Sequence, residues 1–178
     1  MTLKSFEGMV ASAMARPTIE TFSDPANAPM DQPPAGCHRK IQRLFDYWQH
    51  GRGDREIPTR ADIDPLKIPD LLPFVFLIDV PADGSPLVYR LVGTAVVSLF
   101  GQEMTGQPVG AGALPRYRAG VLQRYRRIIA ARRPFFHYAQ LRELNNDFTH
   151  VKRLILPLSD GGRVNMLLGM TVERAKRR

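Results

Sequence analysis

The chain has 178 residues, 44% of them hydrophobic, which fits one folded domain with extensions and argues against disorder over most of its length. Its single cysteine, Cys37, excludes an internal disulfide framework and a multi-cysteine metal site, so we expect a reducing, cytoplasmic setting. The net charge is +8, and residues 116–133 carry seven arginines and no acid, which leaves an anionic partner or a solvated basic face as alternatives.

Residues 1–36 have the composition of a flexible extension. Five prolines lie among small and polar residues, so the segment offers little apolar surface to offset the entropy cost of ordering. The first residues contain no apolar run of signal-peptide length, and no stretch approaches the roughly 18–20 apolar residues that a bilayer-spanning helix needs. We therefore expect a soluble protein with no membrane partner.

An amphipathic helix is predicted over residues 37–50. Its apolar residues recur at three- and four-residue steps and form one stripe: Ile41, Leu44, Phe45 and Trp48. We expect Phe45 and Trp48 to pack against a sheet or against a second copy of the helix, and we expect a homodimer through this segment.

A second helical start follows at Asp64-Pro65. An aspartate followed by proline is typical of a helix N-cap and the first helical residue. Pro69 and Pro73 keep the following helical pieces short. Together with the first helix, these pieces make residues 37–70 an N-terminal helical segment.

Two strands and a short helix come next. Residues 74–80 form a continuous apolar run, and the turn residues 82–86 connect it to a second strand over 87–92, which predicts a hairpin. Residues 94–100 then form a helix of two turns, which ends at Gly101.

The longest predicted helix spans residues 114–131. One face is apolar and carries Leu114, Tyr117, Val121, Tyr125 and Ile128. Arg116, Arg126 and Arg127 point away from this face.

Three strands close the chain, at residues 135–141, 151–158 and 164–172. Asparagine-, aspartate- and glycine-rich turns separate them. The order of elements is therefore two strands, two helices and three strands, after the N-terminal helical segment.

Several short segments, taken with this order, carry a family resemblance. They are Tyr89-Arg90-Leu91-Val92-Gly93-Thr94, Leu99-Phe100-Gly101, Thr105-Gly106 and residues 154–162. The chain resembles a PAS domain, and more narrowly a poorly characterised family of short stand-alone bacterial PAS proteins. In that family a Tyr-Trp helix and an Arg-Ala-Asp-Ile-Asp-Pro segment precede the sheet, and here these are Tyr47-Trp48 and residues 60–65. The resemblance covers about residues 38–173.

The resemblance implies an α+β fold with a five-stranded antiparallel sheet, short helices on one face and an added N-terminal helix. The expected organisation is a flexible proline-rich extension over 1–36, the helical segment over 37–70, the PAS domain over 71–174 and a basic tail over 175–178.

The resemblance also implies where a ligand would lie, between the inner face of the sheet and the helices at 94–100 and 114–131. The candidate ligand-binding residues are Arg90, Val97, Phe100, Tyr138, Arg153 and Met166. An arginine turned inward needs a carboxylate or phosphate partner, because an unpaired buried charge is costly. For Arg90, Asp79 on the preceding strand is an equally good partner, so a structural ion pair and a ligand anion remain alternatives. For Arg153, which lies among apolar residues, it is likewise open whether the partner is a ligand or another residue of the chain.

No cofactor is expected. Haem-binding PAS domains place a histidine on the long helix, but none of the four histidines lies in 114–133, and only His137, on a strand, remains a distant candidate. We expect its imidazole to point outward or to be satisfied locally. The photochemical flavin site needs a cysteine after the first hairpin, whereas Cys37 precedes the sheet. The protein should be colourless.

Catalytic and metal-binding patterns are absent from the sequence, so we do not expect an enzyme. The favoured function is a sensory PAS protein that binds a small molecule, a signalling protein partner, or both. The first alternative is a ligand-free interaction scaffold whose cavity is filled by its own side chains. A basic nucleic-acid-binding protein is the less favoured second alternative, because no recognition module is present.

Overall fold

Six antiparallel strands form one sheet in the computed structural model, which describes residues 18–20, 29–113, 115–142 and 148–173. In spatial order the strands are β1 (Thr18–Glu20), β4 (Phe135–Arg142), β5 (Phe148–Ser159), β6 (Val164–Glu173), β2 (Val75–Asp79) and β3 (Val88–Val92). The five-stranded antiparallel sheet predicted from the sequence is confirmed as β4-β5-β6-β2-β3, and β1 is an addition at its edge.

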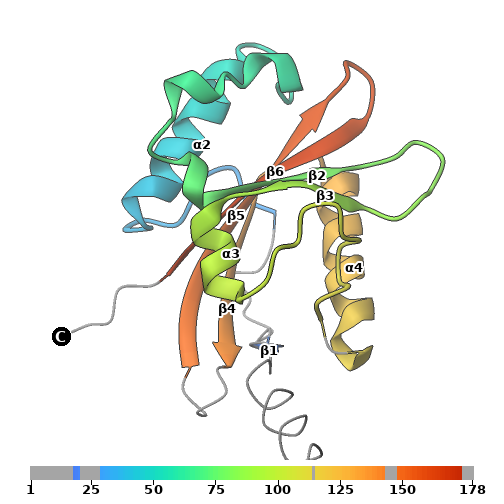
Figure 1. Ribbon diagram of the computed structural model, residues 1–178. Helices are drawn as coiled ribbons and strands as arrows, with labels where there is room; N and C mark the ends of the chain where they lie inside the picture. Colours follow the sequence, from blue (N-terminus) through green and yellow to red (C-terminus); the bar gives the residue numbers. More distant parts are fainter. Residues whose placement is uncertain (1–17, 21–28, 114, 143–147, 174–178) are drawn as a thin grey trace, which may run out of the picture.

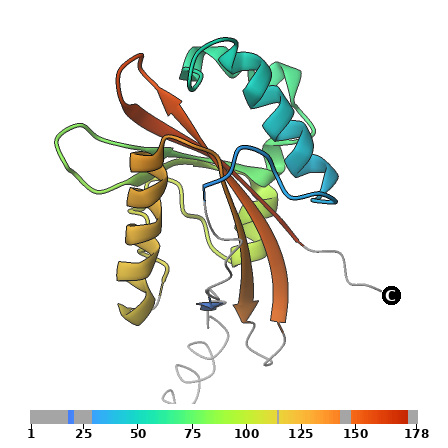
Figure 2. The same cartoon turned by 180° about the vertical axis from the view of Figure 1, so that it is seen from behind.

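The helices lie on both sides of this sheet. They are α2 (Arg39–Arg52), α3 (Thr94–Phe100) and α4 (Pro115–Ala131), with short 3-10 turns at Arg60–Asp62, Pro65–Lys67 and Leu72–Phe74. Figures 1 and 2 show α3 and α4 on one side of the twisted sheet and α2 with the 3-10 turns on the other. We call the side that α3 and α4 cover the inner face, and the opposite side the outer face.

The apolar stripe of α2 packs on the outer face. Ile41, Leu44, Phe45 and Trp48 are all buried, and the indole Nε1 of Trp48 donates to the Pro157 carbonyl of β5 at 2.9 Å. Packing against the sheet is thus confirmed. Because the stripe is buried within one chain, a homodimer through this helix would have to use its remaining surface, and the dimer stays a prediction.

The start predicted at Asp64-Pro65 is also confirmed. The Asp64 carboxylate accepts a hydrogen bond from the Leu66 amide at 3.0 Å, and Pro65 is the first residue of its 3-10 turn. The Tyr47 hydroxyl accepts from the Asp64 amide at 2.8 Å, so the turn is fastened to α2.

Register between the central strands decides which side chains share the inner face. His137, Arg153 and Thr171 are successive cross-strand partners on β4, β5 and β6. Phe76 of β2 pairs with Gly169 of β6, and a side chain at Gly169 would collide with the Phe76 ring. The missing side chain therefore lets Phe76 lie flat across the inner face, close to Arg153.

Helix α4 faces the sheet with its predicted stripe. Tyr125 and Ile128 are buried, whereas Arg116, Arg126 and Arg127 are exposed, as the sequence predicted. The predicted first residue of this helix, Leu114, lies outside the described residues.

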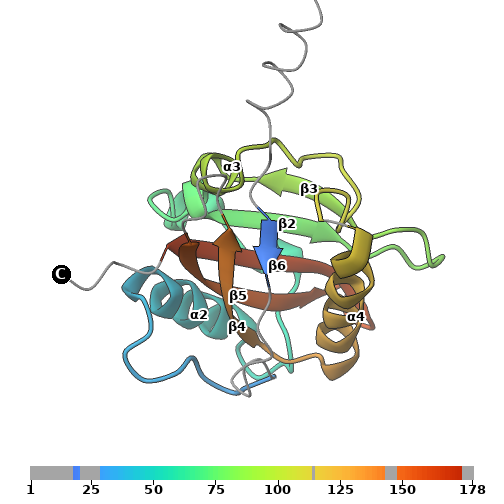
Figure 3. The same ribbon diagram turned by 90° about the horizontal axis from the view of Figure 1, so that it is seen from below.

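Parts of the N-terminal extension pair with strand β4 (Figure 3). Thr18–Glu20 forms β1 in register with residues 140–142, and the Met30 amide donates to the Pro134 carbonyl at 2.9 Å. The other residues of 1–28 and the basic tail at 175–178 lie outside the described residues, so the flexibility of the extension and the predicted division of the chain stay predictions.

Gly93 joins β3 to α3 at a point of close backbone approach, which gives a testable prediction. A Cβ placed on Gly93 would collide with the carbonyl oxygens of Leu72 and Pro73, and backbone atoms cannot move aside easily. We expect Gly93→Ala to lower the free energy of unfolding by about 1–3 kcal/mol, as overpacking does.

Gly120 provides the matched control. It lies on the exposed side of α4 with no atom near its would-be Cβ, so Gly120→Ala should stabilise the protein by about 0.5–1 kcal/mol through helix propensity. Urea denaturation measures the unfolding free energy of both variants. Equal stability of the two variants would contradict the close approach at Gly93.

Candidate functional site

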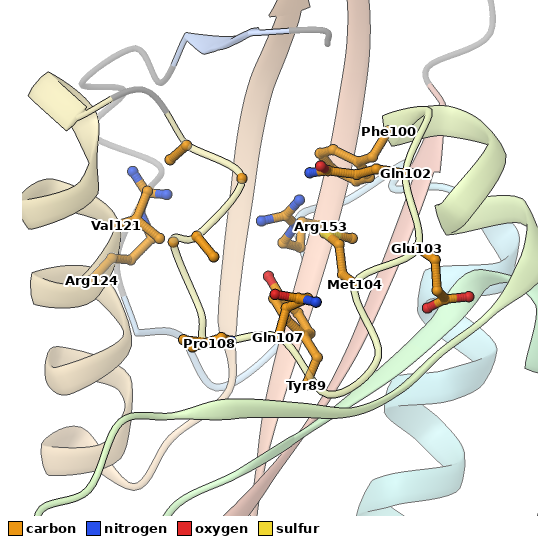
Figure 4. Close-up of a pocket in the computed structure, with 14 residues that line it drawn as sticks. Tyr89, Phe100, Gln102, Glu103, Met104, Gln107, Pro108, Val121, Arg124 and Arg153 are labelled. Carbon is orange, nitrogen blue, oxygen red and sulfur yellow. The ribbon is translucent and has the colours of Figure 1, made fainter. Parts of the chain in front are cut away.

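A cavity of about 390 Å³ lies on the inner face (Figure 4). Tyr89 and Arg153 line it from the sheet, Phe100 from the end of α3, and Val121 and Arg124 from α4. The remaining wall is the segment 102–113, which connects the two helices.

Backbone hydrogen bonds hold this wall against β3. The Gly106 amide donates to the Tyr89 carbonyl at 2.7 Å, and the Tyr89 amide donates to the Gln107 carbonyl at 3.0 Å. The Val109 amide donates to the Leu87 carbonyl at 2.8 Å. On the other side, the Arg118 Nε donates to the Gly110 carbonyl at 3.1 Å, which ties the wall to α4.

Arg153 is the most unusual side chain of the cavity. It is only 7% exposed, and its Nε donates to the Thr171 hydroxyl at 3.1 Å. Its guanidinium carbon lies 5.7 Å from the Phe76 ring centroid and 5.4 Å from that of Phe100, within cation–π range. Within the described part of the chain, no carboxylate forms an ion pair with it.

Arg124 adds a second positive charge from α4. The side chain is half-buried, and its pKa is lowered by desolvation and by the nearby charge of Arg153. Both arginines line the same cavity (Figure 4), so each raises the cost of the other's positive charge.

His137 lies behind these arginines, fully buried on β4. Neither ring nitrogen has a hydrogen-bond partner among the residues that the structure describes. Desolvation, followed by the charges of Arg124 and Arg153, lowers the pKa of His137 to about 2. The expectation of an outward or locally satisfied imidazole was wrong, because the cross-strand register turns this position toward Arg153 and the interior.

Two tyrosines complete the polar part of the inner face. Tyr89 points from β3 toward Arg153 (Figure 4), and desolvation, followed by the neighbouring Tyr125, raises its pKa. Tyr125 on α4 is buried beside it. Of the two, only Tyr89 is among the residues that line the cavity, where its hydroxyl can meet a polar ligand.

The structure brings together two of the six predicted ligand-binding residues, Phe100 and Arg153. Arg90 is exposed, and its Nε donates to Asp79 at 2.7 Å, which confirms the structural ion pair considered for it. Val97 packs against the core without lining the cavity. Tyr138 and Met166 lie on the outer face, where the Tyr138 ring faces the ammonium of Lys152.

Sequence reasoning missed Tyr89 and Arg124, and it considered His137 only as a distant haem ligand. Arg124 lies three residues after Val121 and directly before Tyr125, at the border of the apolar stripe. That spacing was the available signal that it differs from the exposed arginines of the same helix.

A second, more open groove of about 430 Å³ lies on the outer face, between the 3-10 turns and strands β2 and β3. Its lining is mostly apolar and includes Leu72, Leu77 and Leu91, of which Leu91 is 44% exposed.

The described residues show neither a metal-binding cluster nor a membrane-spanning helix. Those residues contain no cluster of three or more histidine, cysteine, aspartate or glutamate side chains that could hold a metal ion. None of the helices described is both long and apolar enough to cross a membrane.

Comparison with known families supports the fold. A family model described as a PAS domain matches residues 37–172. Among solved structures, the PAS domain of BvgS from Bordetella pertussis aligns with a TM-score of 0.50 and 18% identity, covering 63% of this chain and 84% of that one. No curated protein matches the sequence.

Two further solved structures are more distant. A PAS domain from Colwellia psychrerythraea aligns with a TM-score of 0.43 and 13% identity, covering 64% of this chain and all of that one. A light-oxygen-voltage domain studied with a flavin analogue aligns with a TM-score of 0.46 and 10% identity, covering 62% of this chain and 84% of that one.

Proposed function

The chain belongs to the PAS domain family, and on that basis we propose that it is a non-catalytic sensory module whose inner cavity binds a small molecule. The observation that carries the proposal is the cavity of about 390 Å³, which combines apolar walls with inward-facing polar groups. Cavities of this volume and mixed lining are typical of small-molecule sites. An interaction scaffold filled by its own side chains would lack such a space.

Strand β5 offers a physical route for the signal. It carries Arg153 on the inner face, and four residues later its Pro157 carbonyl accepts the hydrogen bond from Trp48 of α2. We propose that occupancy of the cavity changes the packing of α2 on the sheet. A ligand can do this only to the extent that it binds one arrangement more tightly than the other.

The signal would leave through protein contacts, to a signalling partner or a second copy of the chain in the cytoplasm. Basic residues exposed on α4, such as Arg126, offer one contact surface to an acidic partner. Nucleic acid is a weaker candidate for this surface.

Native mass spectrometry and thermal denaturation with a metabolite library test the proposal. Val121→Trp, which fills the cavity from α4, should abolish binding, whereas Ala119→Trp on the exposed side of the same helix should not. A bound compound at a hundred times its dissociation constant should stabilise the wild-type protein by about 2.7 kcal/mol. An unliganded mass together with an unchanged melting temperature across the library would instead favour the scaffold.

A further inference from the structure

The charges around the inner cavity do not balance. Arg153 and Arg124 both line it, and Glu103 is the one acidic residue among the described lining residues. The Glu103 carboxylate accepts a hydrogen bond from the Thr105 amide at 2.7 Å and is turned away from both arginines (Figure 4). Among the described residues, no carboxylate therefore serves as a counter-ion to the two guanidinium groups in this partly enclosed space.

Such an arrangement destabilises the unliganded protein. A guanidinium that is more than nine-tenths buried loses most of its hydration, and a second positive charge nearby raises the cost further. The hydroxyl of Thr171 and the rings of Phe76 and Phe100 compensate in part. An anion that enters the cavity would remove both penalties at once.

The geometry of Arg153 suits a planar or tetrahedral anionic group. Thr171 engages only the Nε, so the two terminal nitrogens face the cavity without a protein acceptor among the described residues. A guanidinium presented in this way binds a carboxylate or a phosphate through two parallel hydrogen bonds. Arg124 lies across the cavity on α4 and can bind the same anionic group from the opposite side, so that the two arginines form a clamp.

The rest of the cavity suits a small organic body. Phe100, Met104 and Val121 supply apolar contacts, and the amides of Gln102 and Gln107 supply neutral hydrogen-bonding groups. This lining suits the organic part of a ligand, which an inorganic ion does not have.

We infer that the ligand of the inner cavity is a small organic anion, whose carboxylate or phosphate group is held between Arg153 and Arg124. This inference rests on the sensory function proposed above and adds the chemical class of the ligand.

The test compares matched charged and neutral probes by native mass spectrometry and calorimetry. One panel contains small carboxylic acids, a second contains phosphate monoesters with inorganic phosphate, and a third contains the corresponding amides and alcohols. We expect hits among the charged panels only, and the first two panels distinguish a carboxylate ligand from a phosphate ligand.

Variants of the clamp sharpen the test. Arg153→Met keeps the length of the side chain and removes its charge, so binding should weaken on the order of 100-fold, as expected for lost charged hydrogen bonds. The unliganded Arg153→Met protein should melt at the same temperature as wild type or higher, because an uncompensated buried charge is gone. Arg126→Met removes an exposed charge from α4 and should bind normally.

Arg124→Gln keeps the inference testable if Arg153→Met does not fold, since Arg124 is only half-buried. Binding of neutral compounds with equal affinity in wild type and both arginine variants would overturn the anion assignment and leave the sensory function standing. Failure of every panel to bind would overturn both.

Discussion

Replacing Trp48 with alanine is expected to lower the free energy of unfolding by about 3–5 kcal/mol. The side chain is 2% exposed and stacks near Phe45, and its indole satisfies the Pro157 carbonyl at 2.9 Å. The substitution therefore removes a large apolar surface, opens a cavity between α2 and the sheet, and leaves a buried acceptor unpaired. Denaturation in urea, followed by far-UV circular dichroism, measures the loss.

Trp48→Phe separates these contributions. It keeps most of the ring packing and removes the hydrogen bond, so it should cost about 1–3 kcal/mol, the penalty for an unsatisfied buried group. Light scattering of both variants tests whether the helix also mediates association. An unchanged unfolding free energy with a weakened dimer would mean that Trp48 serves an interface instead of the core.

The second large effect concerns pH and His137. Its pKa is about 2 in the folded protein against 6.5 for an ordinary histidine, so the unfolded chain binds the proton first as the pH falls. Stability should therefore be fully present above about pH 6.5 and should fall by about 1.4 kcal/mol for each pH unit below it. At about pH 4.5 the loss attributable to His137 would approach 3 kcal/mol.

His137→Phe should remove this dependence, because phenylalanine fills the same interior position without a titrating group. The quantity to compare is the difference in unfolding free energy between variant and wild type across the acidic range, in which the contributions of carboxylates cancel. His38→Asn is the control. His38 also has a lowered pKa and caps α2, and asparagine preserves the cap. Parallel curves for His137→Phe and wild type would contradict the assignment.

Saturation with an anionic ligand should raise the acidic pH at which the loss of wild-type stability levels off, and so reduce the total loss. The charges of Arg124 and Arg153 lower the pKa of His137, and an anion between them would offset that repulsion. The folded-state pKa would rise toward that of the unfolded chain. This links the acid stability of the protein to its ligand.

Most elements of the fold were predictable because their signals are local. The stripe of α2, the Asp64-Pro65 start and the glycine end of α3 depend on spacing and backbone conformation within a few residues. Strand β1 was not predictable in this way. Its three residues carry no pattern of their own and form a strand only because β4 provides a hydrogen-bonding partner.

The candidate site was harder to predict because it depends on strand register and on which face of the sheet each strand residue occupies. A shift of one residue moves a side chain to the other face of a sheet, and this separates Tyr138 on the outer face from His137 on the inner face. An irregularity between Leu77 and Ile78 also shifts the pairing of β2 with β3. No sequence pattern gave these details, so Tyr89 was missed and Arg90 was assigned to the ligand site.

The pairing along β4 has a consequence for self-assembly. The outer edge of a sheet exposes unpaired amides and carbonyls that can recruit a strand from another molecule. Here β1 covers one end of the β4 edge, and at the other end the Met30 amide bonds to the Pro134 carbonyl. At the opposite edge of the sheet, residues 106–109 cover β3. A second molecule, or an extended peptide, can add a strand at these positions only by displacing a segment that the chain supplies itself.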